Sequence, residues 1–384
     1  MKLNAKELHA IRGACLQRVQ ISRLAMVGTL TLLLGCHEPR DVPSSIPPVQ
    51  NSKGPSLVFV SRATHLASPP LRAAQIVAID LNSHQQRVLF SDKDQPFRLE
   101  TAGLAANSVF AYVGAREPWA TVKWEGGRSR PIGYAMLELA LKAPPAHRKI
   151  FEPLGENVVS QIFVHPQGQK IGYVAPLGRW AANDNYRAPR RMVFIHRTDT
   201  GQLLHRFELV TPPCHRCELG TIGWYDDRRL HYSLTAPPED YIGDSVLTDR
   251  LGIYTVNEDG SELAKLPAKF FLTSSKPSLR EGKLIPENIG VLMTGKLLVM
   301  APPVAPGAPV LLYPVDLSRG VEAEYVVSTD AFGFKLPYPG RYLVYQQRDL
   351  NGAYLWVKNL ETSVETRLLQ LPEGEFQVLG WLNP

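Results

Sequence analysis

Two cysteines, Cys214 and Cys217, have the spacing in this chain that is best suited to chemistry. A Cys-x-x-Cys pair can form a disulfide, supply half of a zinc site or act as a redox pair. Zinc would need two more ligands, and the chain has no second Cys-x-x-Cys. Redox pairs usually lie at a helix N-terminus, whereas this pair follows Pro212 and Pro213 between expected strands. We therefore expect a disulfide, with redox-active thiols and a metal site as alternatives.

The remaining histidines and carboxylates show no spacing typical of a catalytic or metal site. Beyond residue 56 the histidines are scattered from His65 to His231, and we interpret single strand histidines, such as His165, as structural. The chain has no Gly-x-Ser-x-Gly motif of the hydrolase type. The sequence thus predicts no catalytic residue, no metal ligand and no cofactor. It favours a non-enzymatic role and leaves an enzyme open.

The first 36 residues have the parts of a bacterial export signal. Residues 1–23 are basic, and residues 24–34 form an apolar segment that is too short to span a bilayer. The segment ends in Leu33-Leu34-Gly35-Cys36, which resembles the lipobox of bacterial lipoproteins. This resemblance implies cleavage before Cys36 and a lipid on its thiol. We expect a signal peptide over residues 1–35; an uncleaved anchor with an accidental cysteine is the alternative.

The residues after the expected cleavage point predict a tether and a location. Residues 36–55 contain five prolines, a composition typical of an extended linker. We expect them to form a lipidated, flexible tether before a folded domain over residues 56–384. His37, not Asp, follows Cys36, and by resemblance to enterobacterial sorting this places the protein in the outer membrane, facing the periplasm.

The net charge argues against nucleic acid as a partner. The chain carries +6, but residues 1–35 hold five Lys or Arg and one Glu, so only +2 remains after cleavage. A domain with so small a charge lacks the electrostatic footprint of a nucleic-acid-binding protein. The expected attachment to the membrane is through the lipid alone.

Beyond residue 56 the sequence repeats with a strand period. Each unit has an approach strand, a tight turn, a strongly apolar second strand, a variable loop, a third strand, a polar turn and a final strand. The second strands are expected at residues 57–61, 109–113, 171–175, 230–234, 297–301 and 342–346. The third strands are expected at residues 75–80, 134–139, 192–196, 252–256, 310–315 and 353–357. Six such units predict an all-β, six-bladed β-propeller.

The two ends of the repeat are complementary. The first unit lacks an approach strand, and residues 376–381 form an approach strand with no unit after it. If this last strand completes the first blade, the ring closes without an exposed sheet edge. We therefore expect the C-terminal strand to pair beside Val58.

Two units resemble the TolB-like and WD-like propeller repeats of bacterial envelope proteins. Residues 163–173, Phe-Val-His-Pro-Gln-Gly-Gln-Lys-Ile-Gly-Tyr, are similar to the turn between the first two strands of those repeats. Residues 253–263 are similar to their third-strand turn. The resemblance spans residues 56–384 but is weak in blades two and five. TolB has an additional N-terminal α/β domain, so its partner contacts are not transferred to this chain.

The long loops of the expected propeller share one rim. They follow the second strands, and long loops on a rigid scaffold are where binding residues usually lie. These loops are rich in Arg and aromatic residues, the usual hot-spot residues of interfaces. The residues expected to bind a partner are Arg116, Trp119, Trp124, Arg179, Trp180, Arg187 and Tyr241. The alternative is that these side chains are solvated or form small local cores.

The leading hypothesis is an envelope-anchored binding scaffold for a protein, or for an anionic peptide or glycan, including a peptidoglycan-associated partner. The alternative is a propeller-type hydrolase or lyase that acts on envelope glycans or peptides. A third possibility is a structural subunit of an envelope complex. Three or more carboxylate or His side chains converging at the channel mouth would favour the enzyme. A broad exposed apolar patch on the outer blades would favour the subunit.

Overall fold

The computed structural model describes most of the chain after residue 53. The described residues are 54–63, 73–95, 97–105, 108–115, 121–123, 129–131, 134–141, 147–153, 159–177, 190–210, 218–235, 250–266, 287–301, 308–322, 325–327, 330–371 and 374–382. All of their regular elements are β-strands. Within these segments no helix is long and apolar enough to cross a membrane.

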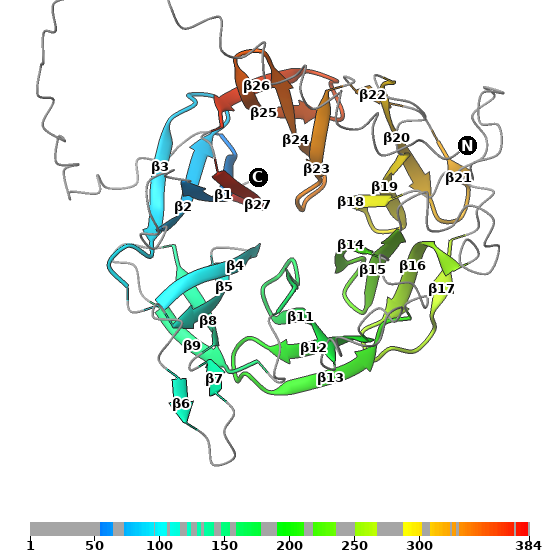
Figure 1. The fold of residues 1–384 in the computed structure, drawn as a ribbon. Helices are drawn as coiled ribbons and strands as arrows, with labels where there is room; N and C mark the ends of the chain where they lie inside the picture. Colours follow the sequence, from blue (N-terminus) through cyan, green and yellow to red (C-terminus); the bar gives the residue numbers. More distant parts are fainter. Residues whose placement is uncertain are drawn as a thin grey trace, which may run out of the picture. The chain divides into compact units, whose positions relative to one another are not determined.

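The strands form six sheets around a central axis, which we number as blades in chain order (Figure 1). Blade 1 contains β27 (Gly374–Leu382), β1 (Ser56–Ala63), β2 (Ala74–Asp80) and β3 (Gln86–Ser91). Blade 2 contains β4 (Phe97–Ala105), β5 (Ser108–Ala115), β8 (Ala135–Ala140) and β9 (His147–Phe151). Blade 3 contains β10 (Gln161–Val164), β11 (Lys170–Leu177), β12 (Arg190–Arg197) and β13 (Leu203–Glu208).

The second half of the ring repeats this order. Blade 4 contains β14 (Glu218–Trp224), β15 (Arg229–Thr235), β16 (Gly252–Asn257) and the short β17 (Ala264–Lys265). Blade 5 contains β18 (Glu287–Met293), β19 (Lys296–Ala301), β20 (Val310–Asp316), β21 (Gly320–Val321) and β22 (Tyr325–Val327). Blade 6 contains β23 (Ala331–Lys335), β24 (Tyr342–Asp349), β25 (Gly352–Asn359) and β26 (Glu365–Gln370).

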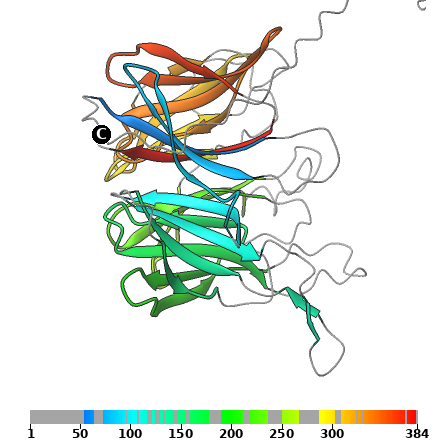
Figure 2. The ribbon, with the colours of Figure 1, turned by 90° about the vertical axis from the view of Figure 1, so that its left-hand side faces the viewer.

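The prediction of a six-bladed propeller is confirmed, and all six expected second and third strands are present. Two details were not predicted. A small hairpin of β6 (Thr121–Lys123) and β7 (Ser129–Pro131) stands apart from the blades (Figure 2). In blade 5 the edge of β20 pairs with two short strands, β21 and β22, in place of one.

The C-terminal strand closes the ring, as predicted. β27 lies antiparallel to β1, with Val378 opposite Phe59 and Gly380 opposite Val58. A β-bulge between Val58 and Phe59 shifts the register. Blade 1 therefore combines the two ends of the folded region, which leaves no open gap in the ring of sheets (Figure 1).

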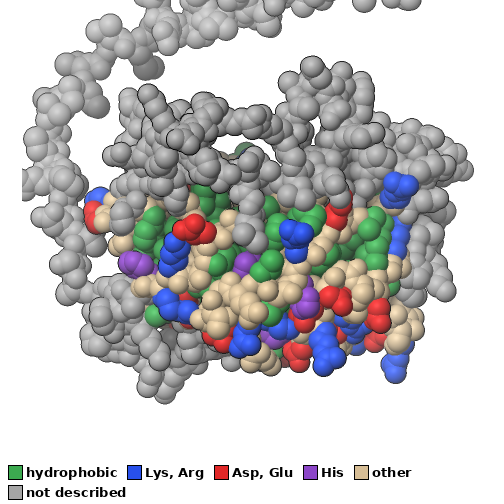
Figure 3. Space-filling model, turned by 90° about the horizontal axis from the view of Figure 1, so that it is seen from below, with side chains coloured by type: hydrophobic (Ala, Val, Ile, Leu, Met, Phe, Trp, Pro, Cys, Tyr) green, Lys and Arg blue, Asp and Glu red, His purple; other side chains and the backbone are tan. Residues whose placement is uncertain are grey.

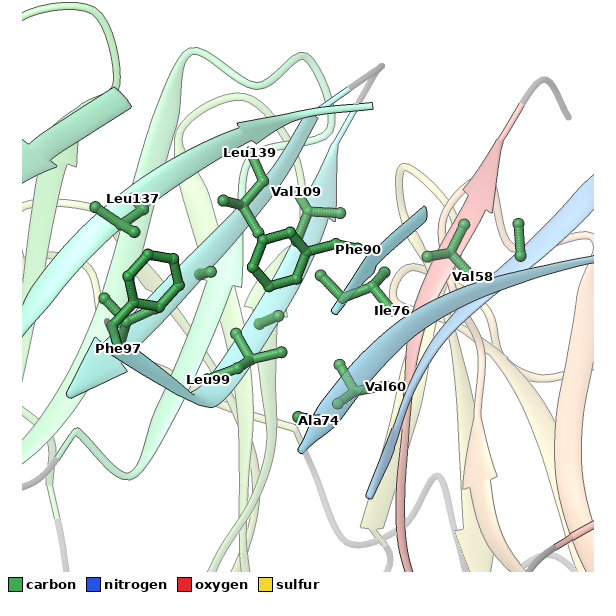
Figure 4. Close-up of a cluster of buried hydrophobic side chains, with 14 of the residues drawn as sticks. Val58, Val60, Ala74, Ile76, Phe90, Phe97, Leu99, Val109, Leu137 and Leu139 are labelled. Atoms are coloured by element: carbon green, nitrogen blue, oxygen red, sulfur yellow. The ribbon is translucent and has the colours of Figure 1, made fainter. Parts of the chain in front are cut away.

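The cores lie between blades because strand side chains alternate between the two faces of each sheet. In β1, Leu57 and Phe59 join a cluster with blade 6, whereas Val58 and Val60 join a cluster with blade 2. Figure 4 shows the second cluster, in which side chains from β1, β2 and β3 meet those of blade 2. Six such clusters occupy the six blade-to-blade seams. Each buried Val, Leu or Phe contributes roughly 1.5–3 kcal/mol, so both faces of every blade stabilise the ring.

Glutamines of the innermost strands link neighbouring blades. Gln377 of β27 donates to the carbonyl oxygen of Ala102 in blade 2, at 2.9 Å. Gln161 of β10 donates to the carbonyl oxygens of Leu219 and Gly220 in blade 4, at 3.1 Å each. These bonds fix the spacing of the inner strands, and those strands form the wall of the central channel.

Candidate functional site

The central channel holds a cavity of about 660 Å³, within the range of small-ligand sites. Residues of the innermost strand of all six blades line it, and those strands are β27, β4, β10, β14, β18 and β23. Most of the lining is apolar or uncharged. The exceptions gather on three consecutive blades, where Glu218, Glu287 and Lys335 line the cavity.

His231 occupies a position that is apolar in the corresponding blades. In four blades an inner-strand glycine lies opposite a bulky residue of the second strand. The pairs are Gly380–Val58, Gly103–Phe110, Gly290–Leu298 and Gly223–His231. The missing side chain at Gly223 leaves room for the imidazole, so His231 lines the channel although it is only 3% exposed. A polar residue therefore replaces a core residue at this point.

A hydrogen bond to blade 5 fixes the imidazole. Nδ1 of His231 lies 2.9 Å from Oδ1 of Asn288, which is fully buried. An amide oxygen only accepts, so Nδ1–H donates and Nε2 remains an acceptor on the channel side. Burial lowers the pKa of His231 to about 4, although the bond to Asn288 opposes this. The imidazole is thus neutral at pH 7.

Glu287, Glu218 and Lys335 influence one another without forming an ion pair. Among the described residues no oppositely charged group lies within 4.0 Å of Glu287 or Lys335. Burial raises the pKa of Glu287, the Lys335 ammonium opposes this and the Glu218 carboxylate adds to it. Burial in turn lowers the pKa of Lys335, and Glu287 offsets part of that effect. Glu218 also attracts Arg191 of blade 3.

A glycine makes room for the Glu287 carboxylate. A Cβ at Gly220 would lie 2.7 Å from Oε1 of Glu287 and 2.3 Å from Oγ of Ser233. The Ser233 hydroxyl is fully buried and has no hydrogen-bond partner among the described residues. We call Glu218, His231, Ser233, Glu287, Asn288 and Lys335 the channel site. Perturbed titratable groups together in a cavity are typical of functional sites.

Substitution of Gly220 tests this packing. Gly220→Ala is expected to lower the free energy of unfolding by about 1–3 kcal/mol, because the new methyl group overlaps Ser233 and Glu287. Chemical denaturation measures the change. Ser233→Ala alone is the control and should change stability little, since it removes a hydroxyl without a partner. The double variant should recover part of the loss; an unchanged stability of Gly220→Ala would contradict the described packing.

No protein-family model matches the sequence, and no curated protein matches it. Solved structures do match the fold. TolB from Acinetobacter baumannii is similar with a TM-score of 0.51 and 13% identity, over 86% of this chain and 67% of that one. The chain has a TolB-like fold. At this identity the likeness shows the arrangement of the blades and not a shared activity.

Other solved structures are similar at lower TM-scores. Oligogalacturonate lyase from Vibrio parahaemolyticus has a TM-score of 0.48 and 14% identity, over 82% of this chain and 79% of that one. Acylaminoacyl peptidase from Pyrococcus horikoshii has a TM-score of 0.47 and 11% identity, over 83% and 46%. A likeness of fold does not by itself identify a function.

The residues singled out from the sequence lie outside the described segments. This holds for the lipid-carrying Cys36, for Cys214 and Cys217, and for the rim residues Arg116, Trp119, Trp124, Arg179, Trp180, Arg187 and Tyr241. These predictions remain predictions. His231 lines the cavity, whereas His165, which was interpreted as structural, is buried beside Trp224. In the described segments no three His, Cys, Asp or Glu residues are grouped to hold a metal ion.

The charged residues of the channel were not predicted from the sequence, although one signal was present. The second strands of a propeller pack on both faces, so their central residues are expected to be apolar. In blade 4 the central residues read His231-Tyr232-Ser233, with polar side chains on the face toward blade 5. That departure from the pattern marks the seam where the channel site lies.

The charged side chains outside the channel are arranged differently from those that line it. Figure 3 shows Lys, Arg, Asp and Glu side chains mixed along one edge of the face it draws. Ion pairs outside the channel include Arg148 with Glu138 at 2.6 Å, and Lys170 of blade 3 with Glu258 of blade 4 at 2.6 Å. Such pairs balance the charge along the edge, so these residues do not form a surface of one sign. In the channel, by contrast, Glu287 and Lys335 have no ion-pair partner among the described residues.

Proposed function

We propose that this protein is a lipid-anchored binding module of the bacterial envelope and that its central channel is a ligand site. The lipobox-like sequence at Cys36 and the proline-rich tether support the anchor. The TolB-like ring supplies a rigid frame for binding. The proposed disulfide between Cys214 and Cys217 would fix the connection between blades 3 and 4.

One observation carries the proposal. Blades 4, 5 and 6 place the charged side chains Glu218, Glu287 and Lys335 in the wall of the cavity, where the lining residues of blades 1 to 3 are uncharged. Beside these charges, the buried Ser233 hydroxyl and Asn288 amide nitrogen have no hydrogen-bond partner among the described residues. Such a group costs about 1–3 kcal/mol, so this part of the arrangement does not serve stability. A ligand that supplies the partners accounts for it.

The rim and the channel are neighbours in the topology. The inner strands β14 and β18 begin with Glu218 and Glu287. Adjacent strands are antiparallel, so the second strands end where the inner strands begin. Strand β11 of blade 3 likewise ends at Leu177, beside the start of its inner strand, and Arg179, Trp180 and Arg187 follow it in the sequence. We propose that the rim loops hold an anionic peptide, glycan or protein partner while part of it enters the channel.

Crosslinking in intact membranes tests the proposal. The full-length protein is compared with a rim variant (Arg179→Ala, Trp180→Ala, Arg187→Ala) and a channel variant (Glu287→Gln, Lys335→Met). The control variant is Lys296→Met with Glu322→Gln, a pair on blade 5 whose groups lie 2.7 Å apart away from the cavity. We expect the control to keep a specific crosslinked species that the channel variant loses. Identical crosslinks from all four proteins would overturn the proposal.

A second candidate function has its own support. Three carboxylate or His side chains line the channel cavity, namely those of Glu218, Glu287 and His231. Three such side chains at the channel were named above as a feature that would favour an enzyme. Glu287 with a raised pKa could serve as a general acid beside a second carboxylate. Incubation of the purified protein with envelope glycan and peptide fragments separates the two functions. Products that form with the full-length protein and not with Glu287→Gln would establish a hydrolase or lyase.

A structural subunit has less support in the described residues. Large apolar side chains that are exposed there occur on several blades, such as Val88 on β3, Leu203 on β13 and Val326 on β22. Single exposed apolar residues are normal on soluble surfaces. They do not require an assembly partner.

A further inference from the structure

The two walls of the channel site offer opposite chemistry. On blades 4 and 5, Glu218, Glu287 and Nε2 of His231 can all accept hydrogen bonds from a ligand. On blade 6, Lys335 can only donate. A ligand that fits both walls therefore carries donors and positive charge at one end, and acceptors and negative charge at the other.

The spacing of the charges leaves room for such a ligand. Lys335 and Glu287 line the same cavity, yet they do not approach within the 4.0 Å of an ion pair. Glu218 is exposed in the same cavity and repels Glu287. An ammonium between the two carboxylates would relieve this repulsion, and a carboxylate beside Lys335 would complete the second pair.

Buried polar atoms beside the channel site also lack partners that a ligand could supply. The amide nitrogen of Asn288 and the hydroxyl of Ser233 are fully buried and have no hydrogen-bond partner among the described residues. Ser233 and Glu287 both lie against Gly220, at the edge of the cavity. Unpaired polar atoms at the wall of a cavity are expected where a ligand or water completes the bonding.

We propose that the channel site binds a short peptide in its zwitterionic form. The ligand's ammonium lies against Glu218 and Glu287, with Nε2 of His231 as a further acceptor, and its carboxylate lies against Lys335. The inference rests on the proposed function, because it assumes that the channel is the ligand site. A neutral glycan would leave all three charges unpaired, and an anionic glycan would pair with Lys335 while the two carboxylates repel it. The volume of about 660 Å³ accommodates a peptide of a few residues.

Titration of the detergent-solubilised full-length protein with alanine peptides tests the inference. The probes are alanine, dialanine and trialanine, which set increasing distances between the two ligand charges. N-acetyl-dialanine lacks the ammonium, and dialanine amide lacks the carboxylate. We expect at least one zwitterionic probe to bind at millimolar concentration or below in calorimetry, and each blocked peptide to bind about tenfold or more weakly.

Variants assign the two charges. Glu287→Gln should lose the preference for a free ammonium, and Lys335→Met should lose the preference for a free carboxylate. Lys296→Met with Glu322→Gln should bind like the unaltered protein. Equal binding of free and blocked peptides, or no binding of any probe, would overturn the inference. If the probes fail while the channel variant still loses its crosslinked partner, the ligand class is wrong and the binding function stands.

Discussion

A chain that ends at residue 373 is expected to lose the cooperative unfolding transition of the intact protein. The truncation removes β27, which pairs with β1 from Ser56 to Ala63 and supplies the inner strand of blade 1. It also removes Trp381, which is 5% exposed and packs on Tyr342 of blade 6 with ring centroids 5.0 Å apart. The loss of these contacts exceeds about 5 kcal/mol, which is comparable to the whole net stability of an ordinary domain.

Denaturant unfolding followed by circular dichroism measures this effect. A chain ending at Leu382 keeps all of β27 and is the matched control. The variant Trp381→Ala should be intermediate, with a loss of about 3–5 kcal/mol, because it keeps the strand and leaves a cavity at the seam. A truncated chain that unfolds cooperatively at the midpoint of the control would show that the ring does not depend on the C-terminal strand.

Stability is expected to fall as the pH is lowered from 6.5 toward 4. The folded state holds the pKa of His231 at about 4, whereas the ordinary value is 6.5. Between these two values the unfolded chain binds a proton that the folded protein excludes, so acid favours unfolding. The contribution of His231 is fully present above pH 6.5 and amounts to roughly 3 kcal/mol lost below pH 4. Burial also lowers the pKa values of His165 and His196, which adds a loss of the same sign.

The double variant His231→Leu, Asn288→Val isolates the contribution of His231. Leu occupies the corresponding position in blade 5, as Leu298, so the change follows the pattern of the fold. Urea unfolding at several pH values between 7.5 and 4 should show a smaller loss of stability in the variant than in the unaltered protein. The same pH dependence in both proteins would show that His231 does not exclude a proton in the folded state.

The architecture could be predicted because it depends on strong, repeated signals. Six apolar second strands at similar spacing require six packed sheets, and the unmatched strand at residues 376–381 required a partner at the start of the domain. Closure follows from pairing every strand, which is a local rule applied around a ring. The hairpin of β6 and β7 and the divided edge of blade 5 were missed because short strands of two or three residues carry almost no periodic signal.

The channel site could not be predicted in the same way. Glu218, Glu287 and Lys335 are far apart in the chain and look like ordinary strand-end charges. The three inner strands meet at one cavity only when the ring is closed. Whether the three charged side chains line that cavity depends on which face of each strand points inward. The Arg- and Trp-rich loops were predicted to bind a partner because their composition alone is typical of interfaces. The polar residues of the second strand in blade 4 were the available clue.

The central claim is that the polar seam between blades 4 and 5 serves a ligand and not the stability of the ring. The unfolding free energy of His231→Leu, Asn288→Val at pH 7.5, measured together with its affinity for zwitterionic alanine peptides, tests this most directly. We predict that the variant has equal or greater stability, because two buried polar groups become apolar. We also predict that it binds the zwitterionic peptides at least about tenfold more weakly than the unaltered protein does. A loss of more than about 2 kcal/mol in stability with unchanged affinity would show instead that the pair is structural.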